Sequence, residues 1–170
     1  MSKTKKFVLA GLFIALQVVF TRFFSIETPI LRVGFGFLPV ALASIALGPI
    51  SGGVIAMLAD ILGMILFPKG TYFPGFTLSA LLSGIIYGIV LYNKENSILR
   101  IAISVLLITF IIDMGLNTLW LSIITGKGIM ILLPSRIIKS LIMIPIEIFC
   151  INIVWKYLYN FMRIPSTKNI

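Results

Sequence analysis

The chain has 170 residues, of which 59% are hydrophobic and only 11% are charged, and its mean hydropathy is +1.15. This composition excludes an ordinary soluble domain and is typical of an integral membrane protein. The single cysteine and the absence of histidine exclude an internal disulfide and a Cys/His metal cluster. The net charge is +9, and the basic residues lie at the ends of apolar runs. This distribution is typical of membrane topology and not of nucleic acid binding.

The apolar runs predict an all-α integral membrane protein with a bundle of six transmembrane helices. Only helices and closed barrels satisfy their backbone in lipid, and these runs lack the ~10-residue alternation of barrel strands. The expected helices cover residues 7–26, 33–47, 50–67, 76–92, 98–124 and 134–161. Together they form a single transmembrane domain that spans residues 1–170.

The first apolar run follows the basic sequence MSKTKK and resembles the start of a signal peptide. It lacks a small-residue cleavage site, however, and it contains Gln17, Thr21 and Arg22. These polar residues favour a helix that is retained in the bundle.

Glycine and proline mark the expected helix boundaries. The sequence GPISGG at 48–53 indicates a tight turn, so the second and third helices are expected to form an antiparallel pair. Pro134 is expected in the first turn of the last helix, whereas Pro145 is expected to bend that helix.

An even number of spans places both chain ends on the same side of the membrane. The side that holds the ends carries eight Lys and Arg residues and the other side six, which favours cytoplasmic termini in a multi-pass, prokaryotic-type cell membrane protein. The segments 28–37, 67–80 and 125–130 are then extracellular. Because irregular backbone at a membrane boundary packs on protein or lines a cavity, we expect them to cap an outward-facing pocket.

Ionisable residues occur inside the apolar runs. Asp60 and Asp113 should face the bundle interior, because a carboxylate facing lipid costs about 2.5–3.5 kcal/mol on insertion scales. Polar residues also share helix faces, in the sets Asp113, Asn117 and Trp120 and Arg136, Lys139, Ser140, Met143 and Glu147. Two interpretations remain open. Either Asp60 or Asp113 pairs with Arg136 or Lys139 and holds the bundle together, or these groups converge on a ligand.

Aromatic residues are concentrated near the expected outer loops. They are Phe35, Phe37, Tyr72, Phe73, Phe76 and Trp120. Each one taken alone is typical of an interfacial aromatic belt. Their position in Gly/Pro-rich segments that also carry Arg32 and Lys69 favours a pocket for a flat heteroaromatic ligand with an anionic tail.

Several functions are disfavoured by what the sequence lacks. The segment GTYFPGFT at 70–77 has the glycine spacing of a phosphate-binding loop but Phe76 where that loop needs lysine. No spacing identifies a nucleophile with its base, so we expect neither an enzyme nor a bound cofactor or metal. Energy for uphill transport would have to come from a partner, and the small residues Ala10, Gly11 and Ala15 of the first helix are a candidate docking strip.

Four longer segments resemble a known family. They are ILRVGFGFLPVALA (30–43), GPISGGVIAMLADILGMILFPKGTYFPGFTLSALLSGIIYG (48–88), LNTLWLS (116–122) and LLPSRIIKSLIMIP (132–145). They resemble the folate-specific S component of energy-coupling factor (ECF) vitamin transporters. The resemblance implies a six-helix subunit that binds folate from outside and works with a transmembrane T component and two cytoplasmic ATPases.

The chemistry of folate suggests roles for the candidate residues. Aromatic side chains would sandwich the rings, namely those of Phe35, Tyr72, Phe73, Phe76 and Trp120. Hydrogen bonds to the pterin edge would come from Thr77, Asn117 and Asp60. The anionic tail would be attracted by the basic residues Arg32, Arg136 and Lys139. In related S components an Ala-x-x-x-Ala strip on the first helix contacts the T component. Here Ile14 follows Ala10 and breaks that pattern, so Gly11 with Ala15 is the nearest equivalent.

Three alternatives to folate binding remain at this point. The first is an S component for another flat vitamin such as thiamine, riboflavin or a pyrimidine precursor. The abundance of outward basic residues disfavours the cation thiamine. The second is a membrane scaffold that transports nothing, which predicts no saturable ligand, and the third is a membrane enzyme, for which no catalytic set is found.

Overall fold

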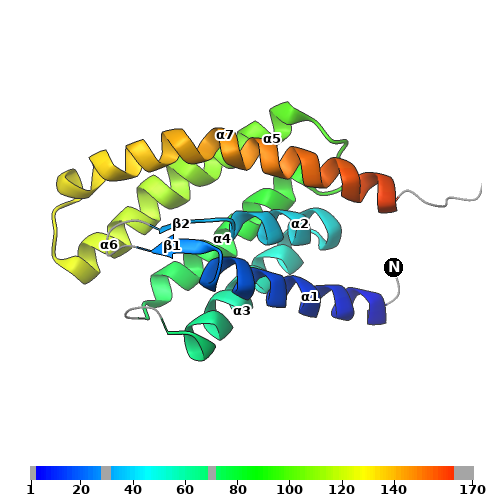
Figure 1. The fold of residues 1–170 in the computed structure, drawn as a ribbon, viewed down its shortest axis with the longest axis horizontal. Helices are drawn as coiled ribbons and strands as arrows, with labels where there is room; N and C mark the ends of the chain where they lie inside the picture. Colours follow the sequence, from blue (N-terminus) through cyan, green and yellow to red (C-terminus); the bar gives the residue numbers. More distant parts are fainter. Residues whose placement is uncertain (1–2, 28–31, 69–71, 163–170) are drawn as a thin grey trace, which may run out of the picture.

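The computed structural model describes residues 3–27, 32–68 and 72–162, and in these ranges the chain is helical except for one short β-hairpin (Figure 1). The elements in order are α1 Lys3–Arg22, β1 Ser25–Glu27, β2 Arg32–Gly34, α2 Phe37–Leu47, α3 Pro49–Leu66, α4 Pro74–Leu91, α5 Ile98–Leu107, η1 Ile108–Asn117, α6 Thr118–Thr125 and α7 Ile129–Met162. Segments α5, η1 and α6 run on as one apolar helix of 28 residues.

The described residues contain 5 helices that are long and apolar enough to cross a membrane. They are α1, α3, α4, the helix over residues 98–125, and α7, whereas α2 is apolar but has only 11 residues. The predicted all-helical membrane fold is confirmed at this level.

The first helix ends at Arg22, four residues before its predicted end, because the chain enters the hairpin. Strands β1 and β2 are antiparallel, with Ser25 opposite Gly34 and Ile26 opposite Val33. A Cβ on Gly34 would lie 2.5 Å from the Cβ of Ser25, so only glycine allows this register. The hairpin also takes up residues 32–34, and α2 therefore begins at Phe37 and not at 33.

The last helix begins at Ile129, so the prediction that Pro134 lies in its first turn is wrong. Both Pro134 and Pro145 lie inside α7. Proline lacks the N–H that an interior helical position normally donates to the carbonyl four residues earlier. Two backbone carbonyls of α7 therefore lose that partner, at Met130 and Leu141.

Helices α3 and α4 pack closely because glycines face each other across their contact. A Cβ on Gly84 would lie 2.6 Å from the carbonyl oxygen of Gly52 and 2.7 Å from the Cα of Gly53. Ser44 of α2 joins the same junction by donating its hydroxyl to the Gly84 carbonyl at 2.8 Å. Small residues allow this backbone approach, which is how membrane helices associate in the absence of a hydrophobic driving force.

The larger apolar cluster among the described residues is formed by side chains of α2, α3, α4, α5, η1 and α7. Its biggest fully buried side chains are Trp155, Tyr87 and Leu91. A second cluster of Phe13, Leu42, Ala43 and Ile55 joins α1 to α2 and α3. Helix α1 is thus attached along one side only, and most of its other residues are exposed to the surroundings.

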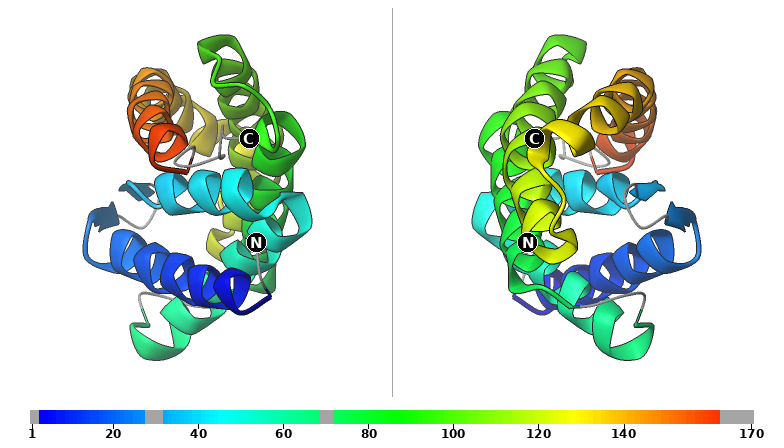
Figure 2. Two further views of the ribbon diagram at one scale, coloured as in Figure 1. Left: turned by 90° about the vertical axis from the view of Figure 1, so that its right-hand side faces the viewer. Right: turned by 90° about the vertical axis from the view of Figure 1, so that its left-hand side faces the viewer.

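The loops fall at opposite ends of the bundle (Figure 1). The start of α1 and the end of α7 lie at one end, and the hairpin and the α6–α7 connection lie toward the other (Figures 1 and 2). The segment η1 has π-helical hydrogen bonding over 10 residues. Such segments are rare and occur frequently at functional sites.

Candidate functional site

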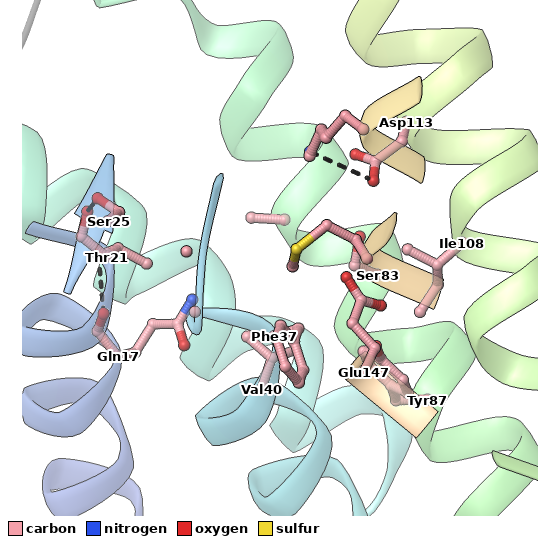
Figure 3. Close-up of a pocket in the computed structure, with 15 residues that line it drawn as sticks. Gln17, Thr21, Ser25, Phe37, Val40, Ser83, Tyr87, Ile108, Asp113 and Glu147 are labelled. Atoms are coloured by element: carbon pink, nitrogen blue, oxygen red, sulfur yellow. Dashed lines mark hydrogen bonds and ion pairs between the residues drawn. The ribbon is translucent and has the colours of Figure 1, made fainter. Parts of the chain in front are cut away.

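A cavity of about 200 Å³ lies among α1, the hairpin, α2, α4, η1 and α7 (Figure 3). Its lining residues are Gln17, Thr21, Ser25, Gly34, Gly36, Phe37, Val40, Ala80, Ser83, Tyr87, Ile108, Asp113, Lys139, Met143 and Glu147. About half of these side chains are polar. A cavity with this lining in a membrane bundle is a candidate binding site.

Helical spacing explains which residues reach the cavity. Lys139, Met143 and Glu147 of α7 are four apart, which places them on one face. Gln17 and Thr21 of α1 have the same spacing, and Ala80, Ser83 and Tyr87 of α4 are three and four apart. On η1 the spacing is five, from Ile108 to Asp113, which matches the wider turn of a π-helix.

Asp113 is the most heavily bonded residue of the cavity wall. Its Oδ1 accepts a hydrogen bond from Asn117 Nδ2 at 2.9 Å, and its Oδ2 lies 3.9 Å from Lys139 Nζ (Figure 3). Its backbone carbonyl accepts from Arg136 Nη1 at 2.9 Å and from the hydroxyl of Thr118 at 3.0 Å. Of the pairings considered for the buried charges, the structure therefore shows Asp113 with Lys139.

Polar atoms of the cavity wall lack partners within the described residues. The Oε1 of Gln17 and the hydroxyl of Tyr87 are buried and form no hydrogen bond there. Figure 3 shows Gln17 on one side of the cavity and Asp113, Ser83, Tyr87 and Glu147 on the other. A buried polar atom without a partner is unfavourable by about 1–3 kcal/mol, so the wall is complementary to a polar ligand.

Among the members of the predicted substrate-binding set whose side chains the structure describes, Lys139 is the one that lines this cavity. Asp60 forms a separate group with Thr77, whose hydroxyl donates to Asp60 Oδ2 at 2.8 Å. The hydroxyls of Thr77 and Tyr72 are 3.2 Å apart. Asp60 is therefore satisfied within the protein, by a threonine and not by the predicted Arg136 or Lys139.

Three predicted aromatic residues come together in a second group. The rings of Phe73 and Trp120 have centroids 5.6 Å apart, and those of Phe73 and Phe76 are 6.2 Å apart. The Trp120 indole N–H donates to the Ser79 hydroxyl at 3.2 Å. This aromatic cluster, Phe73, Phe76 and Trp120, joins the start of α4 to α6 but does not line the cavity described above.

The other predicted site residues have different positions. Phe35 is exposed, with its ring 6.1 Å from that of Phe37, which does line the cavity. Asn117 and Arg136 lie behind the wall and hold Asp113. The side chain of Arg32 and all of Lys69 lie outside the described residues.

The predicted docking strip on α1 is divided between two faces. Gly11 and Ala15 are exposed, and a Cβ on Gly11 would meet no atom within 4 Å. Ala10 is half-buried and packs against the apolar cluster of Phe13 and Leu42. Gly11 and Ala15 thus remain available to a partner, whereas Ala10 is partly covered by the bundle itself.

The cavity residues outside the predicted substrate-binding set include Gln17, Thr21, Ser25, Phe37, Ser83, Tyr87, Asp113, Met143 and Glu147. Gln17 and Thr21 indicated only a retained helix. Phe37 was one of the clustered aromatics, and Asp113, Met143 and Glu147 belonged to polar stripes that could converge on a ligand. The signal that points to them is the four-residue spacing of polar side chains within apolar helices. Tyr87 and Ser83 have no such signal, because the sequence does not show which face of α4 borders a cavity.

Comparisons with known proteins agree over nearly the whole chain. A sequence model of the family described as "ECF transporter, substrate-specific component" matches residues 5–155. The folate transporter FolT of Clostridium novyi (strain NT) is 46% identical over 156 residues, which cover 92% of this chain and 91% of that protein.

Two solved structures have the same fold. The crystal structure of FolT bound with folic acid superposes with a TM-score of 0.81 at 42% identity, covering 87% of this chain and 89% of that one. The structure of the S component of a bacterial ECF transporter has a TM-score of 0.68 at 23% identity, with coverage of 95% and 99%. The second match concerns the fold alone.

Proposed function

The chain belongs to the family of substrate-specific components of ECF transporters, and from this premise we propose that it is the folate-binding subunit of an ATP-driven vitamin importer. The observation that carries the proposal is the 46% identity to a folate transporter over 92% of the chain. The match to the FolT structure that holds folic acid supports it independently. The protein is a multi-pass protein of the cell membrane, and its family is a transporter component and not an enzyme.

We place the bicyclic head of folate in the cavity of about 200 Å³. Pockets that bury a drug-sized ligand measure about 300–1,000 Å³, so this cavity suits the pterin head and not the entire vitamin. Phe37 offers an aromatic face to the ring, and the surrounding polar atoms offer hydrogen bonds.

The remaining predicted contacts belong to the rest of the ligand. Phe35, Tyr72 and the aromatic cluster lie against the benzoyl ring, and Arg32 with Lys139 attracts the two carboxylates of the glutamate tail. Asp60, Thr77, Asn117 and Arg136 keep the pocket in shape through the hydrogen bonds described above. These roles are hypotheses that rest on the chemistry of folate.

For the topology we propose six membrane-embedded helices in one transmembrane domain, with α2 as the short sixth helix, and both termini in the cytoplasm. Support comes from the position of the start of α1 and the end of α7 at the same end of the bundle (Figure 1). The excess of Lys and Arg on that side favours the cytoplasm.

We also propose that the partners are a transmembrane T component and two cytoplasmic ATPases, which supply the energy for uptake. The exposed small residues of α1, Gly11 and Ala15, are the proposed point of docking. Close approach of another helix requires small side chains on both surfaces.

Gly11→Leu tests the docking surface. The substitution is expected to leave the folate affinity of the isolated subunit unchanged, because a Cβ at Gly11 meets nothing within 4 Å. It should lower folate uptake by the complete transporter by about tenfold or more, since the new side chain separates two closely packed helices. Folate-binding titrations and uptake assays in cells measure the two effects.

Gly128→Leu is the matched control for Gly11→Leu. A Cβ at Gly128 would also meet no atom within 4 Å, but this residue lies in the α6–α7 connection, away from α1. Normal uptake in both variants contradicts the docking role of α1, and loss of binding in Gly11→Leu contradicts the separation of the two functions.

Purification of the chain alone tests the proposed function. We expect the protein to retain a pterin absorbance spectrum or, once stripped, to bind folic acid saturably at one molecule per chain. Equilibrium tryptophan quenching should respond to folic acid and not to thiamine or riboflavin, because Trp120 lies among the aromatic residues assigned to the ligand. A response to riboflavin alone would indicate an S component for another vitamin, and no response to any of the three would support a scaffold.

A further inference from the structure

Two buried polar atoms of the cavity wall lack a hydrogen-bond partner among the described residues. The Oε1 of Gln17 is an acceptor, and the residue is only 9% exposed. The Tyr87 hydroxyl, on a residue 2% exposed, has no partner within the described residues. Both groups line the same cavity, from opposite sides (Figure 3). A ligand that fits this wall can offer a donor to Gln17 Oε1 and either a donor or an acceptor to the Tyr87 hydroxyl.

Glu147 is one of two acidic residues that line the cavity. Figure 3 shows it on the same side of the cavity as Ser83 and Tyr87. Lys139 forms its ion pair with Asp113 and not with Glu147, and no hydrogen bond or ion pair to Glu147 is found among the described residues. The accepting capacity of its two carboxyl oxygens is therefore unused within the described residues.

Asp113 differs from Glu147 in this respect. Each of its carboxylate oxygens already faces a donor, Asn117 Nδ2 for one and Lys139 Nζ for the other. The backbone carbonyl of Asp113 accepts two further hydrogen bonds, from Arg136 and Thr118. Of the two acidic groups in the cavity, Glu147 is therefore the one that is available to a ligand.

We propose that Glu147 selects the ligand by accepting hydrogen bonds from two adjacent N–H groups on the edge of its heterocycle. In folate, which the proposed function supplies as the ligand, these are the 2-amino group and the neighbouring ring N–H. Two parallel N–H···O bonds to one carboxyl group add geometric specificity as well as energy.

The test compares two ligands that differ at the 2-position of the heterocycle. The first is folic acid, and the second is its analogue in which oxygen replaces the 2-amino group, so that an acceptor faces the carboxylate. The protein should prefer folic acid by about a hundredfold or more, because a site built for an N–H rejects a ligand that lacks it. A wild-type protein that binds folic acid but accepts both ligands with similar affinity overturns the proposal without any variant.

Glu147→Gln then assigns the preference to this residue. The amide keeps the shape but offers a donor beside an acceptor, so folic acid should bind about tenfold to a hundredfold more weakly. The analogue should bind as well as before or better, which reduces the preference to less than about tenfold. Glu147→Asp keeps the charge and should retain the preference for folic acid at lower affinity.

Glu95→Gln is the matched control, because Glu95 is an exposed residue of the α4–α5 connection and lies outside the cavity. Its preference should equal that of the wild type. If Glu147→Gln weakens both ligands equally, or neither, Glu147 does not select the ring. Failure of the wild-type protein to bind folic acid is a different result, which overturns the proposed function.

Discussion

Ser83→Phe is expected to reduce folate affinity by a hundredfold or more. Ser83 lies on the α4 wall of the cavity, and the much larger phenyl ring would project into a space of only about 200 Å³. The pterin head and the new side chain cannot occupy this volume together, since protein interiors are close-packed and yield little. Equilibrium binding of folic acid to the purified subunit measures the effect.

The fold itself should tolerate this substitution, because the ring enters an existing cavity. The ligand-free thermal unfolding midpoint is therefore expected to stay the same or rise. Ser51→Phe makes the same chemical change at an exposed position outside the cavity and should bind folic acid normally. Wild-type affinity in a folded Ser83→Phe protein would place the ligand elsewhere.

Gly84→Ala is expected to have the largest effect on stability. Its Cβ would lie 2.6 Å from the carbonyl oxygen of Gly52 and 2.7 Å from the Cα of Gly53. Both are backbone atoms, so no side-chain rotation relieves the contact and α3 must move away from α4. Overpacking of this kind destabilises by about 1–3 kcal/mol or more, which exceeds the roughly 1 kcal/mol that alanine gains over glycine in helix propensity.

Gly11→Ala provides the comparison for Gly84→Ala. The same atom is added to a helix, but nothing lies within 4 Å of it, so the protein should be as stable as the wild type or slightly more stable. Unfolding of the two purified variants in the same detergent measures the difference. Equal midpoints would contradict the close α3–α4 packing.

The helices could be predicted from the sequence because lipid imposes strong constraints on length and polarity. The hairpin could not, because Ser25 and Ile26 continue the apolar run of α1, and strands of three residues leave little periodic signal. The start of α7 was missed for a similar reason, since Pro134 is tolerated inside the helix and does not mark its beginning.

The candidate site was predicted in part. Polar stripes on the last two long helices identified Asp113 and Lys139 as inward-facing residues, and the structure pairs them at the cavity wall. The loop aromatics do come together in the case of Phe73, Phe76 and Trp120, but they do not line this cavity. Tyr87 and Gln17 can be identified as site residues only from the packed structure, because their distinguishing feature is a buried polar atom without a partner among the described residues.

The most direct measurement is a crystal structure of this protein with folic acid bound. The pterin ring should occupy the cavity between Gln17 and Glu147, with its 2-amino group within hydrogen-bond distance of the Glu147 carboxylate and the glutamate tail directed out of the cavity. A ring bound elsewhere, with this cavity unfilled, would contradict the account.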